Sequence, residues 1–207
     1  KLYSIKGNAI MSTEVRNQSE RAALEALLAQ VEKAEGPDRE LDGSIMFDLF
    51  AKPVGKAPDG GPRGYLWPDD NPSWSFGMRF PGKPREWFKP STEDHEKILI
   101  ERDGAFVQMN SLRIPALTAS VDAAVSIMKR RLDWKYRCGE SFGEWRNGVL
   151  YTGWAHLNKR HSSDCDRHEE STGWAHTVPL ALIAAMLKGI LAQANSDPER
   201  IGKPTRP

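Results

Sequence analysis

A five-residue segment occurs twice near the C-terminal end: Thr152-Gly-Trp-Ala-His156 recurs twenty residues later as Thr172-Gly-Trp-Ala-His176. In a β-strand, alternate residues point to the same face, so the Thr, Trp and His of each copy share a face. If the copies pair antiparallel with Trp154 opposite Trp174, then His156 faces Thr172, and His176 faces Thr152. We therefore expect two adjacent strands whose tryptophans pack in the core or against each other across the strands.

The residues around this pair predict helices. After the second copy, Thr177 is a candidate N-cap, Pro179 occupies the first turn, and apolar residues recur with helical spacing up to Leu191. Similar spacing predicts a helix over residues 16–35, which Gly36-Pro37 ends, and a second helix from Asp38. A further helix is expected after Ser120 or Thr118, whose hydroxyls can cap it.

Strands and loops complete the predicted fold. Alternation predicts strands over residues 74–80, 105–109, 134–137, 149–157 and 171–176. Residues 52–72 contain five prolines and four glycines and are expected to form a long loop, while the polar segment 81–104 reads as an insertion. The order of elements predicts an α+β fold, in which an antiparallel sheet is sandwiched by helices and long loop excursions leave the sheet.

The length of 207 residues suits a single domain, which we place at residues 11–195 with the insertion at about 81–104. Residues 1–10 precede Met11-Ser-Thr-Glu14, which resembles a natural start, so they are expected to be a disordered or added extension. Residues 196–207 are polar and rich in proline, which predicts a flexible tail.

The composition excludes some classes of protein. With 29 basic and 28 acidic residues, the formal charge is +1, which argues against a protein that coats duplex DNA. No apolar run approaches the ~20 residues of a membrane span. Two cysteines, Cys138 and Cys165, cannot form a disulfide scaffold, which fits a reducing cytoplasm.

Four of the five histidines and Cys165 fall between residues 156 and 176. His161, Cys165 and His168 are weak candidates for metal ligands, since imidazole and thiolate are the donors that zinc prefers. Their spacing matches no standard zinc motif, and a polar loop is the alternative interpretation. A metal-dependent enzyme built on this cluster, including His156 and His176, is one hypothesis for function.

Catalytic motifs are otherwise missing from the sequence, so we expect no enzymatic activity and no cofactor, zinc being the alternative. Basic and aromatic residues interleave in two segments, which supports a second hypothesis, the binding of nucleic acid or a nucleotide. The residues that would carry it are Arg85, Trp87, Lys89, Arg130 and Arg131. The structural alternative for Arg130 and Arg131 is that cations at a helix end interact favourably with the helix dipole.

Three blocks of sequence resemble the phage ABA sandwich domain family of small bacteriophage and prophage proteins. They are Glu35-Gly-Pro-Asp-Arg-Glu-Leu-Asp42, Leu117-Thr-Ala-Ser-Val-Asp-Ala-Ala-Val125 with Leu132-Asp-Trp134, and Thr177-Val-Pro-Leu-Ala-Leu-Ile-Ala-Ala-Met-Leu187. More than a hundred residues between the blocks are unmatched, and Val178 interrupts the Thr-Pro pair of the family pattern. The resemblance implies a layered helix–sheet–helix domain of phage origin, and it implies no activity.

Together these observations predict a non-enzymatic, phage-type accessory protein in the cytoplasm of the bacterial host. It would bind a host protein or protein complex, for example to inhibit a defence system, and it could form a homo-oligomer. Recognition commonly uses loops on a rigid scaffold, and aromatic residues there have no strand or helix to bury them. We therefore expect exposed partner-binding residues at Trp67, Arg85, Trp87, Phe88 and Lys89.

Overall fold

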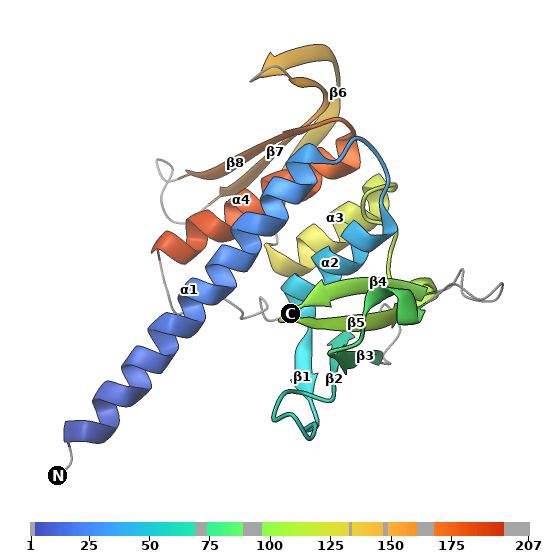
Figure 1. Cartoon of the computed structure of the whole chain (residues 1–207). Coiled ribbons are helices and arrows are strands. Elements are labelled where there is room, and N and C mark those ends of the chain that lie inside the picture. Colours follow the sequence, from blue (N-terminus) through green and yellow to red (C-terminus); the bar gives the residue numbers. More distant parts are fainter. Residues whose placement is uncertain are drawn as a thin grey trace. The chain divides into compact units, whose positions relative to one another are not determined.

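The computed structural model describes residues 3–68, 74–88, 97–132, 134–146, 149–160 and 168–196. These residues form four α-helices and two antiparallel sheets packed against helices, which confirms the predicted α+β class, with two sheets in place of one (Figure 1). The helices are α1 (Tyr3–Lys33), α2 (Arg39–Phe50), α3 (Val121–Arg131) and α4 (Val178–Ser196), with short 3-10 helices η1 (Arg85–Phe88) and η3 (Ser111–Arg113). The strands are β1 (Lys52–Val54), β2 (Gly64–Pro68), β3 (Trp74–Pro81), β4 (Lys97–Arg102), β5 (Ala105–Asn110), β6 (Lys135–Arg146), β7 (Val149–Arg160) and β8 (His168–Ala175).

The chain divides into two compact units, each with its own sheet. The first unit contains residues 1–36 and 119–207, and the second contains residues 37–118. The single domain with an insertion stays a prediction. Within the described ranges, no helix combines the length and the apolar character needed to cross a membrane.

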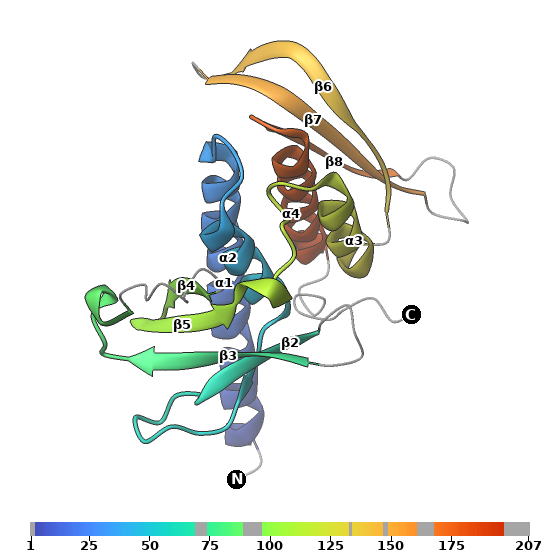
Figure 2. The ribbon, with the colours of Figure 1, turned by 90° about the vertical axis from the view of Figure 1, so that its right-hand side faces the viewer.

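In the first unit, strands β6, β7 and β8 form an antiparallel sheet in that order, and α4 packs on β7 and β8. Helices α1 and α3 pack on α4, and Figure 2 shows α3 and α4 on the same side of the sheet. The predicted register is confirmed, because Trp154 pairs with Trp174 and His156 pairs with Thr172. Thr152 donates a hydrogen bond of 2.6 Å to the carbonyl oxygen of His176.

The face of this sheet that meets α4 carries mostly small side chains. Gly153, Ala155 and Leu157 of β7 and Ser171, Gly173 and Ala175 of β8 are all buried. A Cβ atom on Gly173 would lie 2.1 Å from the carbonyl oxygen of Ala181, so the β8 and α4 backbones are in direct contact. Since alternate residues point to opposite faces, Trp154 and Trp174 lie on the face turned away from α4. The two tryptophans are opposite each other in the register, on this outer face, and are not part of the core between sheet and helix.

Replacement of Gly173 by alanine is expected to destabilise the first unit, because the added methyl group meets backbone atoms, which cannot rotate away as a side chain can. Overpacking of this kind costs about 1–3 kcal/mol, and we expect the upper end of that range. Gly36→Ala is the matched control, since nothing lies within 4 Å of its added methyl group. Urea unfolding followed by circular dichroism measures both losses. Equal stability of the two variants would contradict the direct contact between β8 and α4.

In the second unit, the five strands pair antiparallel in the order β1-β2-β3-β5-β4, and α2 packs on one face. The predicted start of α2 is confirmed, because the side chain of Asp38 accepts a hydrogen bond from Leu41 N. Gly43 allows close packing, since a Cβ atom there would lie 2.7 Å from side-chain atoms of both Ile98 and Met109. The sheet face under α2 is therefore the core of this unit.

The predictions of a long loop at residues 52–72 and of an insertion at residues 81–104 are wrong in part, because both segments contain regular secondary structure. The segment 52–72 contains β1 and β2, and the segment 81–104 contains η1 and β4. The prolines are compatible with strands because Pro53 lies in the edge strand β1 and Pro68 ends β2, where a missing N–H group is tolerated. The turn from β4 to β5 is made by Asp103 and Gly104, both with positive φ (51° and 67°), a pattern typical of a tight hairpin.

The N-terminal helix also differs from the prediction. Helix α1 begins at Tyr3, whereas the sequence pattern predicts a start near residue 16. The apolar positions on which that prediction rests include Leu24, Leu27 and Val31, and all three are buried. Helix α3 agrees with prediction, since the Ser120 side chain accepts a hydrogen bond from Ala123 N. The tail from residue 197 lies outside the described residues.

Candidate binding surfaces

Phe76, Met78 and Phe80 of β3 lie on the face of the five-stranded sheet that is turned away from α2. The register pairs Tyr65 with Gly77, and the Tyr65 ring contacts Phe47 of α2 at 4.6 Å between ring centroids. Gly77 therefore points toward α2, and Phe76 and Met78 point away from it. Sequence alternation identifies this strand correctly, but it gives no indication that its large side chains are on the outer face.

The position of Trp67 explains why Phe76 and Met78 lie on the outer face and not in the core. Its side chain is 0% exposed, and a Cβ atom on Gly77 would lie 2.8 Å from the Trp67 ring. The indole therefore fills the space over Gly77 on the α2 side, where Gly77 itself contributes no side chain. The expectation that Trp67 is an exposed binding residue is wrong, because Trp67 belongs to a paired strand and not to a loop.

Four aromatic rings form a cluster on the outer face of this sheet. Phe88 of η1 packs against Phe80 at 5.2 Å, against Phe106 at 5.3 Å and against Trp87 at 5.0 Å, all in edge-to-face geometry. Phe106 is buried beneath the cluster, whereas Trp87 is 55% exposed. Next to the cluster, Phe76 and Met78 are 44% and 47% exposed. We call this surface, made by Phe76, Met78, Phe80, Trp87, Phe88 and Phe106, the aromatic face.

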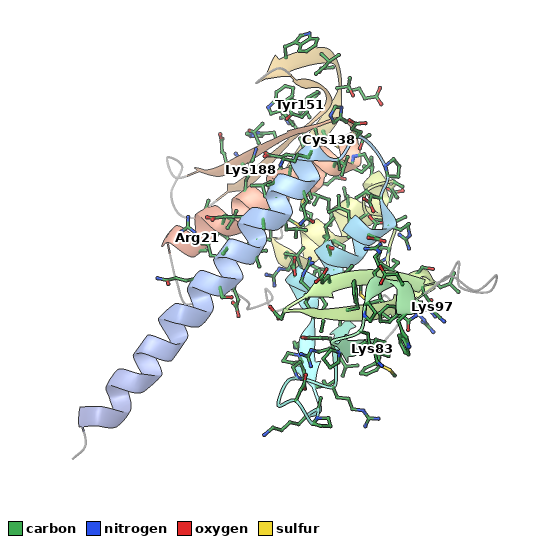
Figure 3. All side chains as sticks on the ribbon, viewed as in Figure 1. Arg21, Lys83, Lys97, Cys138, Tyr151 and Lys188 are labelled. Atoms are coloured by element: carbon green, nitrogen blue, oxygen red, sulfur yellow. The ribbon has the colours of Figure 1, made fainter. Side chains whose placement is uncertain are left out.

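Positive charges border the aromatic face. Lys83 lies over the Trp87 ring at 5.0 Å from its centroid, a cation–π contact that holds one side of the indole. Arg85 pairs with Glu40 of α2. Lys52 and Lys97 are exposed and share this side of the sheet by strand alternation. Figure 3 shows Lys83 and Lys97 extending from the second unit. Among the described residues at this border, four cations accompany three carboxylates, Glu40, Glu86 and Glu101.

The structure brings together three of the five residues expected to bind a partner. Trp87 is exposed, Phe88 is half-buried in the aromatic cluster, and Arg85 is exposed beside them. Lys89 lies outside the described residues. The sequence pattern did not identify Phe76 and Met78 as exposed. The signal that would have done so is Gly77 between them, because a residue without a side chain leaves room for Trp67 on the opposite face.

Of the residues expected to contact nucleic acid, Arg130 and Arg131 belong to the first unit, whereas Arg85 and Trp87 belong to the second. Burial lowers the pKa of Arg131, with the nearby charge of Glu20 acting in the opposite direction. Arg130 is half-buried at the end of α3. Burial of Arg131 makes that guanidinium a poor choice for an accessible phosphate contact, since phosphate binding uses exposed cations.

The outer face of the β6–β8 sheet is a second candidate surface. Strand pairing places Gly139, Trp154 and Trp174 in one row across the sheet, and Arg137, His156 and Thr172 in the next row. The His156 ring nitrogen Nδ1 lies 3.3 Å from the Thr172 hydroxyl oxygen. Trp154, Trp174 and His156 are half-buried, whereas Arg137 and Thr172 are exposed.

The metal hypothesis falls on residues that the structure does not describe. His161 and Cys165 lie outside the described residues, as does the side chain of His168. In the parts of the chain that are described, no group of three His, Cys, Asp or Glu residues could hold a metal ion. His176 packs against the Tyr151 ring at 5.7 Å, and burial raises the pKa of the Cys138 thiol, which keeps it protonated.

Comparison of the chain with protein-family models, curated proteins and solved structures found no match. The resemblance to the phage ABA sandwich domain therefore stays a prediction.

Proposed function

We propose that this chain acts by binding another protein, whose apolar segment docks on the aromatic face of the second unit. The observation that carries the proposal is the exposure of Phe76, Met78 and Trp87 on one sheet face: 44%, 47% and 55%. Contiguous exposed apolar residues with a polar rim are typical of protein–protein interaction sites. A central aromatic anchor with surrounding contacts is the usual arrangement of an interface hot spot.

The shape of the cluster supports Trp87 as the anchor. Edge-to-face packing against Phe88 and the cation–π contact with Lys83 hold the indole in place before a partner arrives. A side chain that is already ordered loses less conformational entropy on binding, so more of its contact energy contributes to affinity. The excess of cations around the face favours a partner segment with acidic residues beside its apolar ones.

The resemblance to the phage ABA sandwich domain family supports a role for the chain inside an infected bacterial host. In that setting the partner is a protein of the bacterial host, and the chain inhibits a host process such as a defence system. No catalytic step is required for this role, because occupying a surface of the partner is sufficient to block it.

Affinity capture with matched variants tests the proposal. Immobilised wild-type protein should enrich a host protein, and the double variant Phe76→Ser, Met78→Ser and the single variant Trp87→Ala should each weaken its binding by about tenfold or more, as expected for hot-spot residues. Leu112→Ser is the control, because Leu112 is 72% exposed in the same unit but lies in η3, which does not contribute to the aromatic face.

The affinities are then measured by titration calorimetry with the purified partner. All four substituted residues are exposed, so we expect the variants to keep their circular dichroism spectra and stability within about 0.5 kcal/mol of wild type. A partner that binds the aromatic-face variants and the Leu112→Ser control equally well would show that the aromatic face is not the docking site.

A further inference from the structure

The outer face of the β6–β8 sheet carries aromatic residues that take no part in the core between the sheet and α4. The opposite face of this sheet is closed by α4, with backbone contact at Gly173. Trp154 and Trp174 therefore contribute nothing to the packing between sheet and helix. Ordinary solvent-facing strand positions hold polar residues, so a cross-strand pair of tryptophans there calls for a separate explanation.

Gly139 leaves space for one of these rings. Gly139 is directly opposite Trp154, and a Cβ atom on it would lie 3.3–3.4 Å from three atoms of the Trp154 indole. The indole thus covers the bare backbone of β6 and lies low on the sheet. Two half-buried indoles side by side form a platform, whose remaining exposed area suits a flat ligand group that stacks.

The rows beside the platform supply positive charge. Arg137 precedes Gly139 by two residues in β6, and Lys135 precedes Arg137 by two more, so all three share a face. Arg137 and Lys135 are both exposed. The only carboxylate in these three rows is Glu170, and it accepts a hydrogen bond of 3.1 Å from Asn158 in the same row. In these three rows two cations therefore accompany one carboxylate, and the resulting net positive charge is complementary to phosphate.

Aromatic residues continue along the same face in the other direction. Trp145 pairs with Leu150 near the end of the β6–β7 hairpin, and Leu150 shares the face of Trp154 by alternation. Their exposed fractions are 72% and 37%. Rows two residues apart along a strand are separated by about 6.8 Å, so stacking groups and cations are spread along an extended track.

We propose that the outer face of β6, β7 and β8 binds single-stranded nucleic acid, with bases stacked on Trp154 and Trp174 and phosphates contacted by Arg137 and Lys135. Sequence-tolerant single-strand binding combines these two elements, stacking platforms and a basic track along the backbone. Paired bases in a duplex do not expose their faces for stacking, so the platform selects unpaired strands. This site is distinct from the aromatic face of the second unit.

Fluorescence anisotropy with a fluorescein-labelled oligothymidylate at low salt tests the proposal on the full chain. Wild type should bind the single strand more tightly than a duplex of the same length. Trp154→Ala should weaken binding by about tenfold, the effect of losing one stacking partner. Arg137→Ala, a change at an exposed position, should reduce the slope of log affinity against log salt by about 0.7, the value for one phosphate contact to a single strand.

Two controls make each outcome decisive. Lys129→Ala removes an exposed cation of α3 that is not on this sheet and should leave affinity and salt slope unchanged. Trp87→Ala should also leave oligonucleotide binding unchanged, which separates this site from the proposed protein-docking face. No binding at low salt, or binding that Arg137→Ala and Trp154→Ala leave intact, overturns the proposal. If a protein occupies this face instead, the oligonucleotide fails to bind at every salt concentration.

Discussion

Replacement of Trp67 by alanine is expected to destabilise the second unit by about 3–5 kcal/mol, the cost of truncating a fully buried tryptophan. Its indole is 0% exposed and occupies the space over Gly77, so alanine would leave a cavity between β2, β3 and α2. The indole nitrogen Nε1 has no hydrogen-bond partner among the described residues, so the loss arises from packing. Trp67→Phe should therefore cost less than Trp67→Ala.

Trp87→Ala is the matched control for this prediction, because the same truncation at a 55% exposed position removes little buried surface. We expect the stability of this variant to stay close to that of wild type, while its affinity for the partner falls by about tenfold or more. Chemical denaturation of the three proteins gives the comparison. If Trp67→Ala were no more destabilising than Trp87→Ala, the placement of Trp67 in the core would be wrong.

Replacement of Arg102 by methionine is expected to destabilise the same unit by about 3–5 kcal/mol at neutral pH. Arg102 donates two hydrogen bonds to the Asp48 carboxylate, from Nε to Oδ1 at 2.9 Å and from Nη2 to Oδ2 at 2.8 Å. The side chain of Asp48 is only 8% exposed. Methionine retains much of the apolar stem but leaves a buried carboxylate without its cation, which is the costly way to break a buried pair.

The loss should depend on pH. Burial already raises the pKa of Asp48 above its usual 3.8, because desolvation outweighs the hydrogen bonds and charge of Arg102. As pH rises, the unfolded chain therefore loses this proton before the folded chain does, and stability falls between 3.8 and the folded pKa. Without Arg102 the folded pKa rises further, so the penalty should be small near 3.8 and grow toward neutral pH.

Urea unfolding of wild type and Arg102→Met across this pH range measures the effect. Arg21→Met is the comparison, since Arg21 and Glu25 form a helix-surface pair with side chains 45% and 52% exposed. Exposed pairs of this kind contribute about 0.3–0.5 kcal/mol. A pH-independent loss in Arg102→Met would indicate that the destabilisation comes from packing and not from the uncompensated Asp48 charge.

Local signals in the sequence predicted several elements correctly, because the residues that decide them are close together in the chain. Asp38 and Ser120 cap the helices that they were expected to begin, and the register of Trp154 with Trp174 follows from the repeated segment. The Asp103-Gly104 turn is also a local signal, and it would have identified the β4–β5 hairpin within the segment read as an insertion.

The orientation of β3 could not be predicted in the same way. Alternation shows that Phe76 and Met78 share a face, but which face is buried depends on Trp67 of another strand. For the same reason Trp67 was expected to be exposed and Trp87, of the same residue type, was correctly expected on the surface. Tertiary packing assigns the two tryptophans to opposite faces of one sheet, and no property of either residue by itself does so.

Hydrogen–deuterium exchange of the chain with and without its captured partner tests the docking proposal most directly. Amide protection reports which backbone segments become covered or stabilised on binding. We predict slower exchange in peptides from β3 and η1, with no change in peptides from β6, β7 and β8. Protection absent from β3 and η1, or confined to another surface, would contradict the proposal that the aromatic face docks a protein.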